Sequence, residues 1–435
     1  MKIKTVNGPV DFVASVPVSK SILARMLVMS ALSFGKCVIN NVFSFSEDNK
    51  ALINALTELG VKIDYDKSRG ILSIEGCNGD FPVKEAELNC ESAGTAARFL
   101  TAMLSFCNGT FVLKGSAQLC RRPMGGLINA LKNAGVNIIC LEKENCLPVR
   151  IEGHKPDDNE TLNFTVDSFE STQYVSGMMM ILAYLPNEST ILSINETRSS
   201  YLEITEKLLE KAGRKITAVR DNAGKSTRFS FENKQLPLPF EWEAEADVSS
   251  ACYFYAVPML TGGKVLVNGV RKDSIQGDMR FLSLLEHFGA TLTDKVNGIE
   301  LAFSEGISAL PNENLEIDMS DFSDQVAAAA VLSAYKKGDT KITGIAHIRM
   351  QESDRIKAVA ENLLKTGIEC ETGEDYLVIH GKTPRGAILD SFGDHRIAMA
   401  FSLMGLVTPG IEILGSECVA KTNEGFYDTL NEVYV

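Results

Sequence analysis

The feature that most restricts how this chain folds is an internal repeat of about 76 residues that runs along nearly all of it. Amphipathic segments such as LINALTELG end in a glycine and lead into β-rich sequence. Their glycines are Gly60, Gly135, Gly213, Gly289 and Gly367. A second series of apolar segments ends at Gly35, Gly109, Asn187, Gly263, Gly338 and Gly410. Since glycine is common just past a helix C-terminus, the two series predict six units of strand, helix, strand, helix and hairpin.

Strands that alternate with helices predict an α/β fold with parallel strand pairing. A closed eight-stranded barrel is disfavoured, because the repeat count is six and hairpins interrupt the alternation. A polar, proline-containing segment at 231–242 follows the third repeat and indicates a domain boundary. The chain of 435 residues exceeds the size of a single hydrophobic core, so we expect two domains with three repeats each.

The balance of charge and the cysteine pattern exclude several classes of protein. The chain has 43 Lys and Arg against 56 Asp and Glu, a net charge of -13, which argues against nucleic-acid and membrane partners. The N-terminus has no signal-peptide pattern, and the ten cysteines include no C-x-x-C pair. We therefore expect a cytoplasmic protein with reduced thiols and no metal site. In so acidic a chain, clustered Lys and Arg indicate a local anion site.

The first helix of every predicted repeat begins with polar or charged residues. These starts are at 20–25, 92–98, 170–173, 247–250, 324–325 and 394–396. Helix N-termini attract anions through unpaired N–H groups and the helix dipole. Asp247 and Asp324 are also favoured N-cap residues, and capping alone would explain either one. The cations Lys20, Arg25 and Arg396 oppose the dipole, so their presence indicates bound anions.

Further cations lie at 121–122, at 349–355 and at Lys421. Pro123 predicts that Arg122 is extended at a helix entrance. Together with the helix starts, these groups predict an enzyme whose substrates are small phosphorylated anions, bound in a cleft between the two halves.

Several motifs then identify a family. They are Lys20-Ser-x-x-x-Arg25, Ser-Ala-Gly-Thr-Ala-x-Arg98, Arg122-Pro, Ser171-Thr-Gln173, Glu352-Ser-Asp-Arg355, Asp394-His-Arg396 and Ala420-Lys-Thr422. In these the chain resembles the 5-enolpyruvylshikimate-3-phosphate synthases, which are enolpyruvyl transferases. The resemblance implies a two-domain inside-out α/β barrel of six βαβαββ units, three per domain, with a cleft between the domains. The first domain would be 20–235 and the second 1–19 with 236–435.

The resemblance also implies the reaction. The carboxyvinyl group of phosphoenolpyruvate would pass to the 5-hydroxyl of shikimate 3-phosphate, a step of the shikimate pathway to aromatic amino acids, with release of phosphate. A monomer without cofactor or metal is expected, with these two small molecules as its partners. Asp324 would be the base for the hydroxyl, and Glu352, Lys20 or His395 would protonate the vinyl carbon.

The implied binding residues form two sets. Those for shikimate 3-phosphate are Lys20, Ser21, Arg25, Ser171, Thr172, Gln173, Arg198, Ser199, Asp324, His347 and Gln351. Those for phosphoenolpyruvate are Lys20, Gly94, Arg122, Gln173, Arg355, Arg396 and Lys421.

The chain departs from the family pattern at Gln351, where lysine is usual, at Ser92, at Asn423–Glu424 and at 197–201. Gln351 keeps open a catalytically weak or silent anion-binding relative with the same fold. A second alternative is UDP-N-acetylglucosamine enolpyruvyl transferase. That family has Asn beside its N-terminal Lys and a reactive Cys in a flexible loop. Here Ser21 follows Lys20, and Cys120 lies directly before the Arg121–Arg122 pair.

Overall fold

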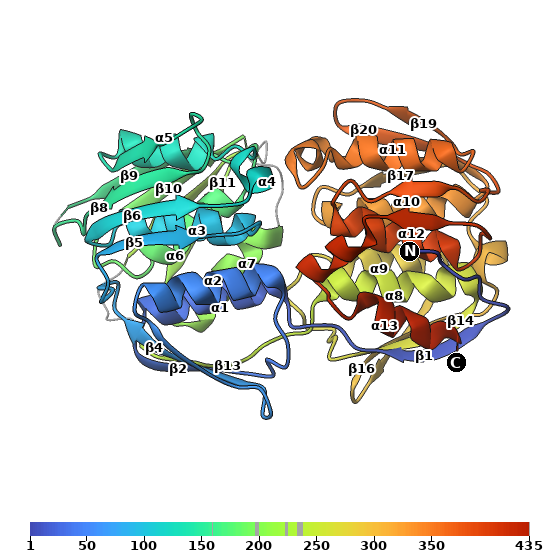
Figure 1. Cartoon of the computed structure of the whole chain (residues 1–435), viewed down its shortest axis with the longest axis horizontal. Coiled ribbons are helices and arrows are strands. Elements are labelled where there is room, and N and C mark those ends of the chain that lie inside the picture. The colour runs from blue at the N-terminus through green and yellow to red at the C-terminus, as the bar shows by residue number, and fades with distance from the viewer. Residues whose placement is uncertain (159, 196–199, 222–224, 233–237, 435) are drawn as a thin grey trace. The chain divides into compact units, whose positions relative to one another are not determined.

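A computed structural model describes residues 1–158, 160–195, 200–221, 225–232 and 238–434 (Figure 1). The chain divides into two compact units. Unit 1 comprises Met1–Ser19 and Glu245–Val435, and unit 2 comprises Lys20–Ala244. The chain therefore passes from one unit to the other twice. Among the residues described, no helix is both long and apolar enough to span a bilayer.

Unit 2 contains the first three repeats. The first has α1 (Lys20–Leu32), β2 (Phe34–Asn40), α2 (Glu47–Glu58), β3 (Lys62–Asp66) and β4 (Ile71–Cys77). The second has β5 (Glu85–Asn89), α3 (Gly94–Ser105), β6 (Gly109–Lys114), α4 (Ala117–Cys120), α5 (Gly125–Asn133), β7 (Asn137–Cys140) and β8 (Val149–Gly153). The third has β9 (Leu162–Asp167), α6 (Gln173–Leu182), β10 (Ser189–Ile194), α7 (Ser200–Lys211), β11 (Ile216–Arg220) and β12 (Thr227–Phe231).

Unit 1 contains the other three repeats. The fourth has α8 (Val248–Thr261), β14 (Gly263–Asn268), α9 (Met279–His287), β15 (Thr291–Lys295), β16 (Gly298–Phe303) and the 3-10 turn η1 (Gly306–Ala309). The fifth has β17 (Leu315–Asp318), η2 (Ser323–Gln325), α10 (Val326–Tyr335), β18 (Gly338–Thr343), η3 (Ala346–Met350), α11 (Arg355–Lys365), β19 (Glu369–Thr372) and β20 (Tyr376–Gly381). The sixth has β21 (Ile388–Asp390), α12 (His395–Gly405), β22 (Glu412–Leu414), η4 (Ser416–Lys421), α13 (Phe426–Asn431) and η5 (Glu432–Tyr434), so helices replace its hairpin.

One sheet topology recurs across the described repeats. In the second repeat β5 is parallel to β6, β6 is antiparallel to β8, and β7 is antiparallel to β8. The third and fifth repeats have the same order, β9-β10-β12-β11 and β17-β18-β20-β19. The predicted glycines at the helix ends are confirmed, since Gly60, Gly135, Gly213, Gly289 and Gly367 have φ between 75° and 99°.

The first and fourth repeats exchange their first strands. β1 (Val10–Ala14) precedes α1 in the chain but pairs in parallel with β14 of unit 1, as Figure 1 shows. Reciprocally, β13 (Glu241–Glu243) precedes α8 but pairs in parallel with β2 of unit 2. Unit 2 therefore extends beyond residue 235 to Ala244, and the two passages of the chain follow directly from this exchange.

The first helix of each repeat forms the interior of its unit. Every residue of α3 and of α12 is buried, and α1, α6, α8 and α10 are buried almost throughout. Helices that are apolar on all sides belong in a core, whereas α2, α5, α7, α9 and α11 bury one face and expose the other. Each unit thus has helices at its centre and sheets outside them.

Candidate active site

The three central helices of unit 2 begin close to one another. They start at Lys20, Gly94 and Gln173, where the sequence predicts polar helix starts. Arg25 of α1 donates to Ser176 Oγ of α6 at 3.1 Å, and Arg98 of α3 donates to Gln173 Oε1 at 2.6 Å. Each bond joins residues within the first two turns of its two helices, so the starts of these helices lie close together. Their N-termini concentrate positive potential at one end of the unit.

Lys20 is held at the start of α1 by groups of α2. Its Nζ lies 3.1 Å from Asp48 Oδ2, and its backbone carbonyl accepts from Asn49 Nδ2 at 3.1 Å. Ser46 caps α2 by accepting from Asn49 N at 3.2 Å. The lysine is therefore oriented before any substrate arrives, and Asp48 balances its charge.

Arg25 is enclosed more completely than its predicted role in binding a carboxylate suggests. Only 1% of it is exposed, and its guanidinium donates to Thr205 Oγ1 at 2.7 Å, Ser21 O at 2.8 Å and Tyr201 O at 3.1 Å, besides Ser176. Burial lowers the pKa of Arg25 to about 10. In this conformation the arginine braces α1 against α6 and α7, and the nearby carbonyl of Ser21 is one of its acceptors.

A second group surrounds the start of α3. A Cβ built on Gly94 would lie 2.8 Å from Arg122 Nη1 and 3.0 Å from Arg98 Nη1, so only glycine lets both guanidinium groups approach the backbone here. Gln173 donates to Thr95 Oγ1 at 3.1 Å, and its backbone N–H donates to Ser171 Oγ at 3.3 Å. The structure thus brings together four predicted residues, which are Gly94, Arg122, Ser171 and Gln173. Thr172, also predicted, is at the N-cap position of α6 beside them. The predicted residues Arg198 and Ser199 lie outside the described residues.

The central helices of unit 1 also begin together. Asp247 caps α8 by accepting from Ser250 N at 2.7 Å, and Asp394 caps α12 by accepting from Arg396 N at 2.9 Å. Gln325 Nε2 donates to Ser249 O at 3.3 Å, which joins the start of α10 to that of α8. The capping expectation holds for Asp247, but Asp324 lies in η2 and makes no side-chain cap. Its carboxylate binds arginines instead.

Arg355 is the centre of an ion network in unit 1, which we define as Asp324, Glu352, Arg355, Asp394, Arg396 and Lys421. Its side chain is 4% exposed, and its Nη1, Nη2 and Nε each lie 2.8 Å from a carboxylate oxygen. The three acceptors are Asp324, Glu352 and Asp394. Burial alone would lower the pKa of Arg355, but these three carboxylates outweigh it and raise the pKa. One buried guanidinium thus fixes three carboxylates in position.

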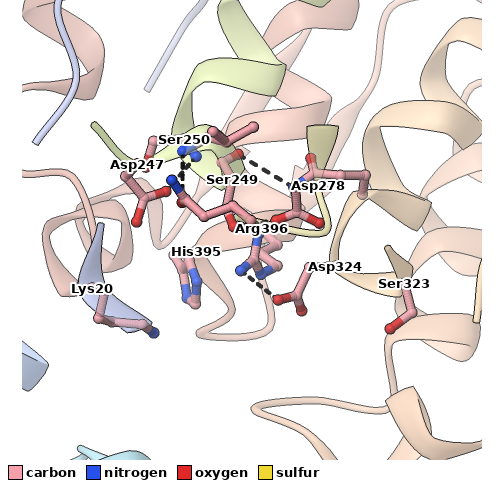
Figure 2. A network of polar contacts seen from close by, with 12 residues as sticks. Lys20, Asp247, Ser249, Ser250, Asp278, Ser323, Asp324, His395 and Arg396 are labelled. Carbon is pink, nitrogen blue, oxygen red and sulfur yellow. Dashed lines mark hydrogen bonds and ion pairs between the residues drawn. The ribbon is translucent and has the colours of Figure 1, made fainter. Parts of the chain in front are cut away.

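Two further cations complete the ion network. Arg396 Nη2 lies 2.8 Å from Asp324 Oδ2, a contact drawn in Figure 2, and Lys421 Nζ lies 2.7 Å from Glu352 Oε1. Each of Asp324 and Glu352 therefore bridges two cations with its two oxygens. Three cations and three carboxylates balance formally, so removing one member would leave an uncompensated charge in a largely buried network.

The remaining predicted residues of unit 1 lie near this network. His347 Nε2 is 2.7 Å from Ser323 Oγ, and burial lowers the pKa of His347, which favours its neutral form. Gln351 is half-buried and directly precedes Glu352. His395 is the first residue of α12, with its side chain 2% exposed and its Nδ1 3.8 Å from Asp394 Oδ1. Arg349 instead holds Asp354, the cap of α11, at 2.8 Å.

Sequence reasoning did not include Asp278 and Ser249 among the site residues. Asp278 directly precedes α9, where an aspartate looks like an ordinary cap, but its side chain makes no capping bond. It accepts a hydrogen bond from Ser249 Oγ of α8, as Figure 2 shows. Burial, followed by the charge of Asp324, raises the pKa of Asp278 from 3.8 to about 6. Nothing in the local sequence signals that this carboxylate points into the site.

This shift predicts how Asp278 affects stability. In the folded protein Asp278 keeps its proton to about pH 6, whereas in the unfolded chain it loses the proton near 3.8. Its contribution to the free energy of unfolding is therefore full below 3.8 and is lost as the pH rises to about 6, by about 3 kcal/mol. Denaturant unfolding of Asp278→Asn at pH 4 and pH 7 should lack this loss. The exposed Asp273 provides the control, since Asp273→Asn should retain it.

Chemically, the two clusters can bind anions and move protons. Unit 2 offers N–H groups at three helix starts with Lys20 and Arg122, and unit 1 offers guanidinium groups beside carboxylates that could accept or donate a proton. The described residues contain no group of three or more His, Cys, Asp or Glu arranged to hold a metal ion.

Proteins of known identity are similar to this chain over its full length. A sequence profile of EPSP synthase (3-phosphoshikimate 1-carboxyvinyltransferase) matches residues 2–430. The 3-phosphoshikimate 1-carboxyvinyltransferase of Methanospirillum hungatei is 33% identical over 428 residues, which cover 98% of this chain and 97% of that protein. The enzyme of the same name from Nitrosomonas europaea is 35% identical over 418 residues, 95% of this chain and 94% of that protein.

Solved structures agree. An EPSP synthase from Acinetobacter baumannii superposes with a TM-score of 0.79 at 25% identity, covering 100% of this chain and 98% of that one. The enolpyruvyl transferase NikO from Streptomyces tendae has a TM-score of 0.74 at 15% identity, covers 99% of this chain and 96% of that one, and shares the fold. These matches confirm the predicted α/β class with its inside-out architecture. By sequence and by fold, this chain belongs to the EPSP synthase (3-phosphoshikimate 1-carboxyvinyltransferase) family.

Proposed function

We propose that this protein transfers the carboxyvinyl group of phosphoenolpyruvate to the 5-hydroxyl of shikimate 3-phosphate and releases phosphate. The observation that carries the proposal is the pair of carboxylates Asp324 and Glu352, both bound to Arg355 at 2.8 Å. The reaction needs one group to take a proton from the hydroxyl and another to give a proton to carbon. The guanidinium of Arg355 binds both carboxylates and would therefore hold the proton acceptor and the proton donor beside one another. The same cation would attract the anionic phosphoenolpyruvate to them.

The chemistry follows from these positions. Asp324 accepts the proton of the 5-hydroxyl while the oxygen of that hydroxyl forms a bond to C2 of phosphoenolpyruvate, and a proton is added to C3. Glu352 is our choice for this donor, with Lys20 and His395 as the other candidates. Removal of a proton from C3 and departure of phosphate from C2 then restore the double bond. The net change is one C–O bond formed, one C–O bond to phosphate broken, and no oxidation or reduction.

We assign the binding of the two substrates to both units. In unit 2 the residues for shikimate 3-phosphate would be Ser21, Arg25, Ser171, Thr172 and Gln173, with Arg198 and Ser199 as expectations outside the described residues. Asp324, His347 and Gln351 would contribute from unit 1. Because Arg25 is already bonded to four acceptors, a carboxylate ligand would have to share or displace one of them.

Phosphoenolpyruvate would be bound by Lys20, Gly94, Arg122, Gln173, Arg355, Arg396 and Lys421. Charge supports this division. The three cations of the unit 1 ion network are already balanced by three carboxylates, so a multiply charged ligand needs additional positive charge. Arg122 and the helix starts of unit 2 would supply it, and Lys20, whose charge Asp48 balances, would add a hydrogen-bond donor.

The direct test is a phosphate-release assay with both substrates and with each substrate alone. We expect phosphate release that requires both substrates, and no release would contradict the proposal. In the same assay, UDP-N-acetylglucosamine as the acceptor tests for the activity of the UDP-N-acetylglucosamine enolpyruvyl transferases. We further propose that the protein is a monomer and that it acts in the cytoplasm. Light scattering on the purified protein would test whether it is a monomer.

The alternative of a weak or silent anion-binding relative is favoured by one residue, Gln351, where the family pattern has lysine. A lysine beside the hydroxyl would stabilise the negative charge that develops on its oxygen, whereas glutamine offers only a neutral hydrogen bond. Gln351→Lys should therefore raise kcat about 10-fold, corresponding to about 1.4 kcal/mol in the transition state. An unchanged or lower kcat would mean that another residue already has the lysine's role. Steady-state kinetics with saturating substrates measure this effect.

A further inference from the structure

Asp278 occupies an unusual place for a carboxylate. It is 6% exposed, and its Oδ2 accepts from the hydroxyl of Ser249 in the first turn of α8. Its backbone carbonyl accepts from Cys252 Sγ, one turn further along α8, at 3.6 Å. Two contacts from one helix therefore fix the residue, and its side chain turns away from the helix that it precedes.

Gln276 holds the same segment from its other end. Its Oε1 accepts from Val248 N at 3.1 Å, and its Nε2 donates to Ala246 O at 2.8 Å and to Glu245 Oε2 at 3.1 Å. The segment 276–278 is thus attached to the start of α8 by a side chain at each end. This attachment leaves the Asp278 carboxyl little choice of direction.

Charged groups from three elements face the Asp278 carboxyl. They are Asp247 from the start of α8, Asp324 from η2 and Arg396 from α12, and Figure 2 shows them around it. Arg396 Nη2 also binds Asp324 Oδ2 at 2.8 Å. The charge of this guanidinium therefore acts on both Asp324 and Asp278. The thiol of Cys252 and the phenol of Tyr253 are further titratable groups of α8 near these charges, and burial raises the pKa of both, which keeps them neutral.

We propose that Asp278, held by Ser249, is a positioning residue that sets how strongly Asp324 holds a proton. This inference rests on the proposed function, in which Asp324 is the base. Two arginines on Asp324 favour its ionised form and thereby weaken it as a base. When Asp278 is itself ionised, its like charge opposes the arginines and makes a proton on Asp324 harder to remove. Asp278 restores basicity to Asp324 without touching substrate.

The test is the pH dependence of kcat/KM in the two-substrate phosphate-release assay. In Asp278→Asn the amide can keep a hydrogen bond to Ser249, but the negative charge is gone. We expect the acid limb, which in the wild type follows the ionisation of Asp278 near pH 6, to move to lower pH by about one unit, and kcat above neutral pH to fall about three- to tenfold because the base is weaker. A residue with only a structural role would lower kcat without moving the limb.

Ser249→Ala provides a second variant that leaves the carboxyl in place. Without the hydroxyl, Asp278 stays protonated to higher pH, so the acid limb should shift in the opposite direction, to higher pH, by a smaller amount. Adding Ser249→Ala to Asp278→Asn should then cause no further shift, because both changes act through one charge. Asp273→Asn, an exposed carboxylate in the same unit, should leave the profile unchanged.

The outcomes separate the two proposals. A wild-type chain that turns over, with an acid limb at the same pH in Asp278→Asn, overturns the inference and leaves the proposed function intact. Additive shifts in the double variant also overturn it. A wild-type chain without turnover contradicts the proposed function itself, and the inference fails with it.

Discussion

Asp324→Asn is expected to lower kcat by about 10³-fold while shikimate 3-phosphate still binds. Asp324 Oδ1 and Oδ2 each accept from an arginine at 2.8 Å, so the carboxylate is oriented when substrate arrives. An amide of the same size can fill the space but cannot take a proton from the 5-hydroxyl. Steady-state phosphate release measures the loss, and calorimetric titration with shikimate 3-phosphate measures binding.

The same substitution also disturbs the ion network, and this effect has to be separated from the loss of the base. Asparagine has one acceptor oxygen, so either Arg355 or Arg396 would face an N–H group instead of a carboxylate. Asp321→Asn is a matched control on the same segment, where the carboxylate is 3.7 Å from the half-exposed Arg280. That variant should keep normal kcat. If Asp324→Asn keeps kcat within tenfold of the wild type, Asp324 is not the base.

Much of the fold is predictable from the repeat, because the sequence of each repeat contains the local signals for its own helices and turns. Glycines such as Gly60 end the amphipathic helices with φ of 89°, and apolar segments such as 94–105 become fully buried helices. The partner of each first strand is not predictable in this way. β1 has the alternating pattern VDFVA, which would fit the edge of any of the repeated sheets equally well. Nothing local in the sequence of β13 indicates that it pairs with β2. The sequence therefore predicts a boundary at residue 235, whereas unit 2 includes β13 and ends at Ala244.

For the site, too, the local features were predictable from the sequence and the long-range contacts were not. Helix starts were predictable, because polar residues before an apolar run have a known tendency to begin a helix, as Asp247 does. Which side chains meet depends on helices far apart in the chain. Asp324 and Asp247 look alike as N-caps in the sequence, yet Asp247 caps α8 and Asp324 pairs with arginines from α11 and α12. The burial of Arg25 and the inward direction of Asp278 likewise arise only from packing.

The role of the cations in phosphoenolpyruvate binding leads to a second large effect. Lys421→Ala and Arg122→Ala should each reduce kcat/KM for phosphoenolpyruvate by about 2–5 kcal/mol, the range for truncating one partner of a buried charge pair. That corresponds to a loss of about 30-fold to several thousand-fold. The two residues belong to different units, with Lys421 bound to Glu352 at 2.7 Å and Arg122 against Gly94. Losses in both variants would support binding by both units.

Kinetics can distinguish the two kinds of loss. In Lys421→Ala, Glu352 loses one of its cations and keeps Arg355, so its proton is held more strongly and kcat should fall together with affinity. Arg122 belongs to unit 2 and lies against Gly94, so Arg122→Ala should act mainly on KM for phosphoenolpyruvate. Arg121→Ala, its exposed neighbour, and Lys357→Ala, an exposed lysine of α11, are the matched controls and should leave both constants unchanged. Normal kinetics in both Lys421→Ala and Arg122→Ala would show that these cations are surface charges without a ligand, since a buried anion cannot lose a charged partner without a cost of this size.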